Sequence, residues 1–302
     1  MIRDVPSHPQ TFSLSSMVYG TWRLLDDGPS PQDINRRLNR CVELGVTAID
    51  TAEIYGLYQV EEALGNAMAL SPGLRNKLSL ITKAGIYVPG AHSPTRRVGH
   101  YDATAAQLSA SVERSLRLLR CEQVELFLVH RPDWLTSIDD TARGLNQLVQ
   151  EGKIRSAGVS NYSASQFAAL NSRMEVPLFT NQVEFHLLHM DPIVDGCFDQ
   201  CQQEQVRPMA WSPLAGGRLF DPNESAARRL AEVAAGMSYR YGGATLEQLA
   251  YAWVMSHPSR PYPIIGTNRI ERIESAVKAS SIRLEREDWY ALWVAAQGRH
   301  VP

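Results

Sequence analysis

The chain has 302 residues, of which 44% are hydrophobic, and its 30 basic and 32 acidic residues leave a net charge of −2. This composition can bury a sizeable core without disulfides or metals, and the lack of like-charge blocks excludes a nucleic-acid-binding arm. No stretch approaches the roughly 20 apolar residues of a membrane-spanning helix, and four cysteines do not make a disulfide framework, so we expect a cytoplasmic protein without a membrane or nucleic-acid partner.

Short apolar runs rich in β-branched residues recur along the chain, and several are apolar enough for parallel strands buried on both faces. The predicted strands are 16–20, 46–50, 78–82, 124–130, 154–160, 178–183, 206–211 and 262–266. Between them lie helical patterns. The first helix begins at Ser30 and Pro31, which favour the N-cap and the first turn, and it ends at Gly45. Further helices are indicated over 108–119, 142–149, 163–170, 245–253, 270–277 and 289–293.

Eight strands alternating with helices predict one α/β domain over residues 1–302, a (β/α)8 barrel. A doubly wound sheet is the alternative, and it normally carries a G-x-G-x-x-G turn after its first strand. Here that turn reads GTWRLLDDGPS, which favours the barrel. Two long segments, 84–104 and 212–224, follow strands and are expected at the carboxyl end of the barrel, where barrel enzymes place their sites.

Polar side chains that follow three consecutive strands suggest a proton-transfer site. Asp50 ends the second strand with Tyr55 shortly after it, Lys83 follows the third, and His130 ends the fourth. Asp50 is expected to be the counter-ion of Lys83, whose charge would lower the pKa of the Tyr55 phenol from about 10 and make it a usable general acid. His130 would hydrogen-bond a substrate oxygen. This set suits protonation of a carbonyl oxygen.

The later strands end in groups that suit a nicotinamide ring. Trp211 is a flat surface for stacking, and Ser160, Asn161 and Gln182 can hydrogen-bond a carboxamide. Glu53, in the same stretch as Asp50 and Tyr55, has no role in this scheme, and we expect it to face solvent or brace its loop.

Seven ordered segments spread over nearly the whole chain carry a resemblance to the aldo-keto reductases. They are DTAEIYG (50–56), ITKAG (81–85), LFLVHRPD (126–133), EGKIRSAGVSNYS (151–163), NQVEF (181–185), AWSPLAGGRL (210–219) and IIGTNRIERIESA (264–276). Through the GHYD stretch at 99–102 and the ending near Pro302, the chain more closely resembles the bacterial branch that includes the YdhF-type oxidoreductases.

The resemblance implies NADPH-dependent reduction of a small aldehyde or ketone, with no metal. By position it makes Tyr55 the proton donor, assisted by Lys83 and Asp50, with His130 orienting the carbonyl. It also implies two cofactor-binding groups: Ser212, Leu214, Gly216, Gly217, Arg218 and Leu219 around the pyrophosphate, and Gly266, Thr267, Asn268 and Arg272 near the adenosine 2′-phosphate.

This chain departs from the family where the adenosine would bind. Gly266 stands where many members have lysine, and Ser275 and Ala276 replace a Glu-Asn pair. Arg272 remains, and a guanidinium suits a phosphate, so NADP(H) is favoured over NAD(H).

The sequence allows three other interpretations. Lys83 could form a Schiff base in a lyase, but Asp50 beside it would keep the amine protonated. A nucleotide-sensing module with vestigial turnover would not need the intact catalytic set. A zinc site built from His186, His189, Cys197 and Cys201 is not favoured, because the sequence between the pairs breaks any compact finger.

Overall fold

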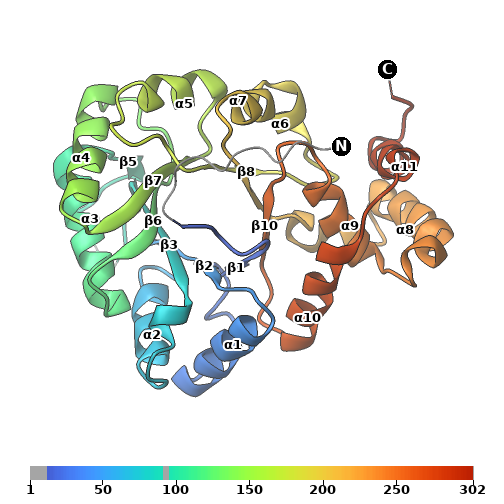
Figure 1. The fold of residues 1–302 in the computed structure, drawn as a ribbon, viewed down its shortest axis with the longest axis horizontal. Coiled ribbons are helices and arrows are strands. Elements are labelled where there is room, and N and C mark those ends of the chain that lie inside the picture. Colours follow the sequence, from blue (N-terminus) through green and yellow to red (C-terminus); the bar gives the residue numbers. More distant parts are fainter. Residues whose placement is uncertain (1–11, 91–94, 302) are drawn as a thin grey trace.

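A closed barrel of eight parallel strands forms the centre of the molecule in a computed structural model, which describes residues 12–90 and 95–301 (Figure 1). The strands are β1 (Val18–Gly20), β2 (Ala48–Asp50), β3 (Ser79–Ala84), β6 (Val124–Val129), β7 (Ile154–Ser160), β8 (Asn181–Glu184), β9 (Met209–Trp211) and β10 (Tyr262–Ile265). Strand β1 pairs with both β2 and β10 and so closes the ring. The predicted fold class is confirmed, and every predicted strand overlaps an observed one.

Helices surround the barrel (Figure 1). They are α1 (Pro31–Glu43), α2 (Val60–Met68), α3 (Ala105–Leu119), α4 (Ile138–Gln150), α5 (Ala164–Asn171), α6 (Asp191–Val194), α7 (Cys197–Gln203), α8 (Ser225–Met237), α9 (Leu246–Met255), α10 (Ile270–Lys278) and α11 (Arg286–Gln297). Ser30 forms the expected cap with Asp33. Helices α2, α6 and α8 were not predicted, and their N-caps, Gln59, Met190 and Glu224, make no side-chain cap bond. None of these three is a residue type that favours the N-cap position.

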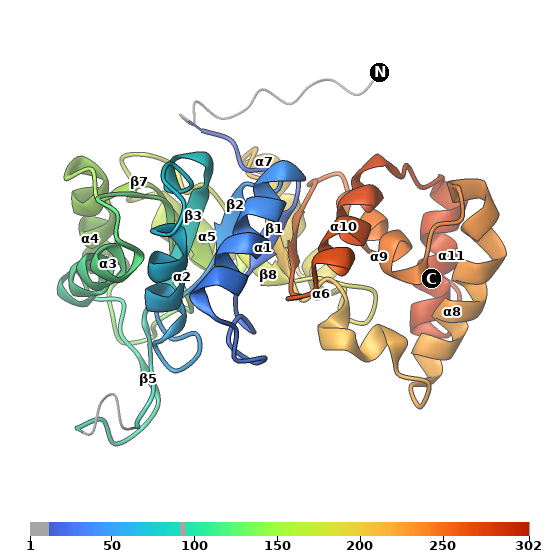
Figure 2. The same ribbon diagram turned by 90° about the horizontal axis from the view of Figure 1, so that it is seen from below.

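The long segment after β3 contains a short hairpin that was not predicted. Strands β4 (Ile86–Tyr87) and β5 (His100–Tyr101) pair antiparallel outside the barrel. Figure 2 shows β5 projecting well away from the barrel. Two-residue strands carry too few alternating residues for a sequence pattern to reveal them.

The barrel interior is apolar except where the site begins. Ala48 and Ile81 lie in the interior cluster, which also contains Val18, Leu126, Leu128, Met209 and Ile264. The side chains of a strand alternate between its two faces. Asp50 lies two residues after Ala48, and Lys83 lies two residues after Ile81, so both side chains point to the barrel interior. Both are almost fully buried. The alternation therefore places a charged pair on top of the apolar layer.

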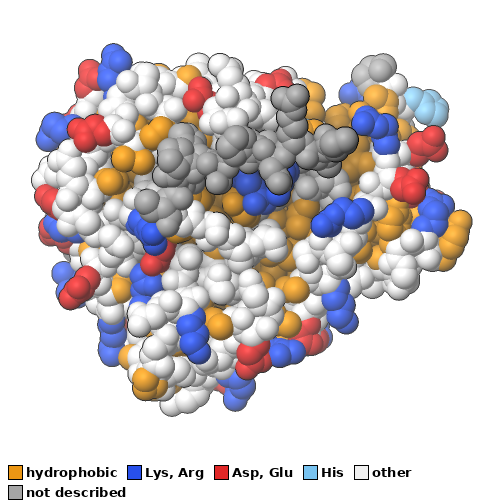
Figure 3. Space-filling view, in the orientation of Figure 1, with side chains coloured by type: hydrophobic (Ala, Val, Ile, Leu, Met, Phe, Trp, Pro, Cys, Tyr) orange, Lys and Arg blue, Asp and Glu red, His pale blue; other side chains and the backbone are white. Residues whose placement is uncertain are grey.

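The surface carries charges of both signs. In Figure 3, basic and acidic side chains are interspersed around the edge of the face shown. Within residues 12–90 and 95–301, no helix is both long and apolar enough to cross a membrane.

A glycine sets the distance between two of the outer helices and allows a stability test. A Cβ at Gly65 in α2 would lie far inside contact distance of the Leu118 carbonyl oxygen in α3. We expect Gly65→Ala to lower the free energy of unfolding by about 2 kcal/mol, because the steric cost exceeds the gain in helix propensity. Chemical denaturation would measure this loss of stability.

Gly236→Ala in α8 is the matched control. A Cβ at Gly236 meets nothing within 4 Å, so this change should be neutral or stabilising. Equal effects of both changes would contradict the close-approach explanation.

Candidate active site

A cavity of about 470 Å³ lies where the barrel strands end. Its lining brings together most of the predicted site residues: Asp50, Tyr55, His130, Ser160, Asn161, Gln182, Trp211, Ser212, Leu214, Gly216, Gly217, Gly266, Thr267 and Arg272. These residues come from loops and strand ends spread over more than 200 positions of sequence, so the closed barrel is what assembles them.

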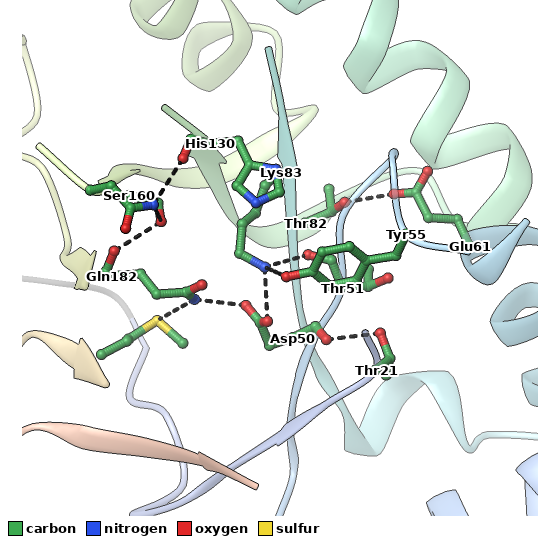
Figure 4. Close-up of polar contacts among 12 residues, drawn as sticks. Thr21, Asp50, Thr51, Tyr55, Glu61, Thr82, Lys83, His130, Ser160 and Gln182 are labelled. Carbon is green, nitrogen blue, oxygen red and sulfur yellow. Dashed lines mark hydrogen bonds and ion pairs between the residues drawn. The ribbon is translucent and has the colours of Figure 1, made fainter. Parts of the chain in front are cut away.

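Lys83 is not part of the cavity lining, and its amine contacts the two groups predicted to be its partners, Asp50 and Tyr55 (Figure 4). Its Nζ donates hydrogen bonds to Asp50 Oδ2 at 2.8 Å, to the Thr51 carbonyl oxygen at 2.8 Å and to the Tyr55 hydroxyl at 3.0 Å. The side chain is fully buried. All three ammonium hydrogens are therefore used, and the Tyr55 oxygen is held next to a positive charge.

The pKa of Tyr55 differs from the expectation. Burial raises the pKa of the phenol above 10, and the Lys83 charge offsets this only in part, while Asp50 adds to the rise. The expected net lowering was therefore wrong for the protein without ligand. For Lys83, burial acts to lower the pKa, but Asp50 and Tyr55 outweigh it and the pKa is raised. The phenol is protonated and the amine charged at neutral pH.

His130 lies against Tyr55 as a neutral imidazole. The two rings meet edge to face with centroids 5.9 Å apart. Burial, followed by the charges of Lys83 and Arg131, holds the pKa of His130 well below its usual value. Its buried Nδ1 has no hydrogen-bond partner among the described residues. A neutral imidazole donates through one nitrogen, so His130 has a hydrogen bond to give to an oxygen in the cavity.

The four residues expected to face a nicotinamide are connected to one another. Trp211 Nε1 donates to Asn161 Oδ1 at 3.0 Å, and Asn161 Nδ2 donates to Ser160 Oγ at 2.8 Å. Gln182 Nε2 donates to Asp50 Oδ1 at 2.8 Å, which ties this group to the Lys83 pair. Asn161 has a positive φ of 60°, a conformation that is uncommon for residues other than glycine and often found at functional sites.

The opposite end of the cavity contains a cation with an acidic partner that the sequence did not reveal. Arg272 donates to Glu247 Oε1 at 3.0 Å, and both side chains line the cavity. Nearby, Gly216 and Gly217 have positive φ values and open space at the Cβ position. Nothing in the sequence links Glu247 to Arg272, since they lie on different helices.

Three predicted cofactor residues do not line the cavity. Leu219 is fully buried in a hydrophobic cluster with α8 and α9, and Arg218 Nε bonds the Ala215 carbonyl oxygen at 3.4 Å. The Asn268 amide oxygen accepts bonds from Tyr19 and Arg37, and its Nδ2 donates to the Arg23 carbonyl oxygen. In this structure the Leu219 side chain packs in the core and the Asn268 side chain bonds to the segment after β1, so a contact of these residues with the cofactor stays a prediction.

Glu53 is buried rather than solvent-facing. Its backbone N–H donates to the Lys83 carbonyl oxygen at 3.0 Å, and its Oε1 has no partner among the described residues. Burial raises the pKa of Glu53, and it raises that of the neighbouring Glu61 to about 7. Glu61 bonds Thr82 Oγ1 at 2.6 Å and Ser115 Oγ at 3.0 Å. Two buried carboxyl groups thus lie behind the loop that carries Tyr55.

The His and Cys residues weighed as a zinc site make other contacts. His186 Nε2 lies 3.0 Å from Glu184 Oε1, and its Nδ1 accepts the Leu188 N–H. Cys197 receives a bond from Asn181. Over the described residues, no group of three or more His, Cys, Asp or Glu side chains is placed to hold a metal ion.

Comparisons with known proteins agree on one family. The model of the aldo/keto reductase family matches residues 16–294. The oxidoreductase YdhF of Escherichia coli is 40% identical over 302 residues and covers all of both chains. The 6-dehydroglucose reductase of Agrobacterium fabrum is 39% identical, covering 95% of this chain and 96% of its own length. The aldo/keto reductase of Klebsiella pneumoniae, solved with NADP and acetate, superposes with a TM-score of 0.76 at 28% identity, covering 92% of this chain and 90% of that one.

Proposed function

This chain belongs to the aldo/keto reductase family and is an NADP(H)-dependent oxidoreductase acting on carbonyl groups, and from that premise we propose that Tyr55 donates the proton in the reduction of an aldehyde or ketone. The observation that carries the proposal is the contact of Lys83 Nζ with both Asp50 and Tyr55. It places the phenol beside a buried positive charge at the edge of the cavity. Such a charge stabilises the phenolate that proton donation leaves behind.

Each of the other catalytic candidates then has a physical task. Asp50 holds the Lys83 ammonium in place, and Lys83 offsets the negative charge that develops on Tyr55. Neutral His130 donates a hydrogen bond to the carbonyl oxygen and positions it beside the phenol. When bound, the reduced nicotinamide supplies the hydride to the carbonyl carbon. Because Asp50 and Lys83 are almost fully buried, their charges act in a medium of lower dielectric constant than water.

The residues present fit an NADP(H) molecule. Ser160, Asn161 and Gln182 would hold the carboxamide, and Trp211 would stack on the nicotinamide. The open backbone of Gly216 and Gly217, with Ser212 and Leu214, suits a pyrophosphate. Thr267, Gly266 and Arg272 line the end where the 2′-phosphate would bind. Glu247 competes for Arg272 there and would weaken, without abolishing, its pairing with a phosphate.

Arg272 is expected to decide the choice between the two nicotinamide cofactors. We expect Arg272→Ala to raise KM for NADPH about tenfold or more, because a charge-assisted phosphate contact contributes roughly 1.5–3 kcal/mol. KM for NADH should change far less, since NADH has no 2′-phosphate. Steady-state kinetics with both cofactors would measure this. Arg269→Ala is the control, since Arg269 is exposed and pairs with Glu271. Equal losses with NADPH and NADH would contradict the assignment of Arg272.

The proposal as a whole is tested by NADPH oxidation with a generic aldehyde such as 4-nitrobenzaldehyde, and with the aldehyde sugar named for the Agrobacterium relative. Tight NADPH binding without turnover across a broad carbonyl panel would favour the vestigial, nucleotide-sensing alternative. A Schiff-base lyase is not supported, because Lys83 has a raised pKa and no free hydrogen-bonding capacity. Borohydride trapping of a Lys83 adduct would revive it.

Two further points are proposals. We propose that residues 1–302 form one domain, supported by the single barrel that runs from β1 to β10. We also propose the cytoplasm as the location, supported by four free cysteines, of which Cys41, Cys197 and Cys201 are buried. Free thiols persist most readily in a reducing compartment.

A further inference from the structure

Arg131 is a cavity-lining cation that has no partner among the residues the structure describes. It directly follows His130 at the end of β6, is half-buried and lines the same cavity as Tyr55. Within residues 12–90 and 95–301 its guanidinium has neither a hydrogen bond nor an ion pair, whereas Arg272 on the other side pairs with Glu247. Its charge also contributes to the lowered pKa of His130.

The acidic group nearest to Arg131 in the chain is engaged elsewhere. Asp133 accepts hydrogen bonds from the backbone N–H groups of Ala103 at 3.0 Å and Leu135 at 2.9 Å, and from the Thr136 hydroxyl at 2.5 Å. Asp133 therefore organises its own loop and does not neutralise Arg131. A half-buried guanidinium left without an anion is electrostatically incomplete and favours an anionic ligand.

The order of strands in the barrel separates Arg131 from the part of the cavity assigned to the cofactor phosphates. Going around the ring, β6 lies opposite β10, and the loop after β10 carries Thr267. Arg23, the third arginine in the lining, follows β1 next to β10 and lies over the Trp22 ring at 5.5 Å. Arg23 is thus on the phosphate side. Arg131 is on the side where Tyr55 and His130 meet the carbonyl.

We propose that Arg131 binds an oxyanion carried by the substrate itself, so that the preferred substrates are small aldehydes or ketones bearing a carboxylate or a phosphate monoester. The proposal rests on the function assigned above to Tyr55 and names its substrate class. The planar guanidinium can form two parallel hydrogen bonds to either oxyanion. Binding of this kind orients the carbonyl at the opposite end of the substrate against the catalytic hydroxyl.

The test compares charged and neutral aldehydes on the NADPH-loaded enzyme. The 2-, 3- and 4-carboxybenzaldehydes cover three spacings between carbonyl and carboxylate, with 4-nitrobenzaldehyde as the neutral reference. Glyceraldehyde 3-phosphate against glyceraldehyde is the phosphate arm. In the wild type we expect at least one charged aldehyde to be preferred, with a kcat/KM that falls as salt is added. Arg131→Gln should raise KM for that aldehyde about tenfold or more, and KM for its neutral reference by less than about twofold.

Two control variants show whether a lower activity with the charged aldehyde comes from misfolding or from the change in net charge. Arg131→Lys retains the charge and should recover part of the preference. Arg97→Gln removes an exposed charge that lies outside the cavity lining and should change neither substrate. Equal changes for charged and neutral aldehydes in Arg131→Gln, or no preference for any charged aldehyde in the wild type, would overturn the proposal.

A binding measurement separates this inference from the catalytic assignment. By calorimetry, the alcohol product of the preferred charged aldehyde (4-(hydroxymethyl)benzoate in the case of 4-carboxybenzaldehyde) should bind the cofactor-loaded Tyr55→Phe variant, and it should bind the same variant carrying Arg131→Gln about tenfold more weakly. Unchanged affinity would sink the role of Arg131 even if Tyr55 proves to be the proton donor. Retained turnover in Tyr55→Phe would sink the catalytic assignment while leaving the anion contact measurable.

Discussion

Replacing Tyr55 by phenylalanine is expected to lower kcat for carbonyl reduction by about 10²- to 10⁴-fold, the range that a positioned general acid contributes. The change removes one oxygen atom and with it the only phenol that contacts Lys83 within the described residues. Binding of NADPH, followed by its fluorescence, should change little, because the residues that would hold the cofactor lie on other strands. The loss should therefore appear in kcat and leave the cofactor affinity intact.

Tyr58→Phe provides a matched control for this experiment. Tyr58 lies three residues further along the same loop, and its hydroxyl accepts a hydrogen bond from Arg96 outside the cavity lining. The same chemical change there should leave kcat within about twofold, in contrast to the 10²-fold minimum expected for Tyr55. If both variants turn over normally, the proton comes from another donor and the assignment of Tyr55 is wrong.

Lys83→Met is expected to lower kcat by about 10²-fold or more and to destabilise the protein as well. Burial raises the pKa of Tyr55 and the Lys83 charge offsets part of that rise, so loss of the charge should raise the pKa further. Alcohol oxidation, which needs the phenolate, should then begin at a higher pH than in the wild type. Breaking a buried pair leaves Asp50 without its cation, which costs about 3–5 kcal/mol. The pH profile of the oxidation rate and chemical denaturation measure the two effects separately.

A double variant distinguishes a catalytic loss from a folding defect. Asp50→Leu combined with Lys83→Met removes both charges, and replacement of a buried pair by apolar groups is often neutral for stability. We expect the double variant to recover most of the lost stability while kcat stays low. Recovery of activity together with stability would mean that Lys83 acts only by holding the fold.

The sequence predicted the catalytic contacts better than it predicted the cofactor side. Asp50, Lys83 and His130 each end a strand, and a barrel brings such positions to one rim whatever the loops do. Asn268 lies in a loop and Leu219 in a short 3-10 helix with two positive-φ glycines, where position in the sequence does not fix the direction of a side chain. The bonds of Asn268 to Tyr19 and Arg37 depend on elements far away in the chain. The packing of Leu219 likewise depends on the later helices α8 and α9.

The pKa of Tyr55 illustrates the same limit. A nearby lysine predicts a lower pKa, and the Lys83 contact is present as expected. The degree of burial, which acts in the opposite direction and is larger, depends on everything packed around the phenol. The exposure of Glu53 was wrongly predicted for the same reason. A charged residue in a loop is expected to face solvent, and only the packing of the surrounding elements shows that this one is buried.

The amino-acid sequence by itself determined the eight barrel strands and most of the helices between them, the identity of the residues at the strand ends and the family to which the chain belongs. These depend on local periodicity, capping and motif order, which are properties of short stretches of chain. The tertiary structure alone decided which of the charged groups have partners. It joined Glu247 to Arg272 and Gln182 to Asp50, buried Glu53 and, within the described part of the chain, left Arg131 without a counter-ion. Pairing and burial depend on distances between elements that only the closed barrel fixes, and they set both the acidity of the site and the charge that it offers to a substrate.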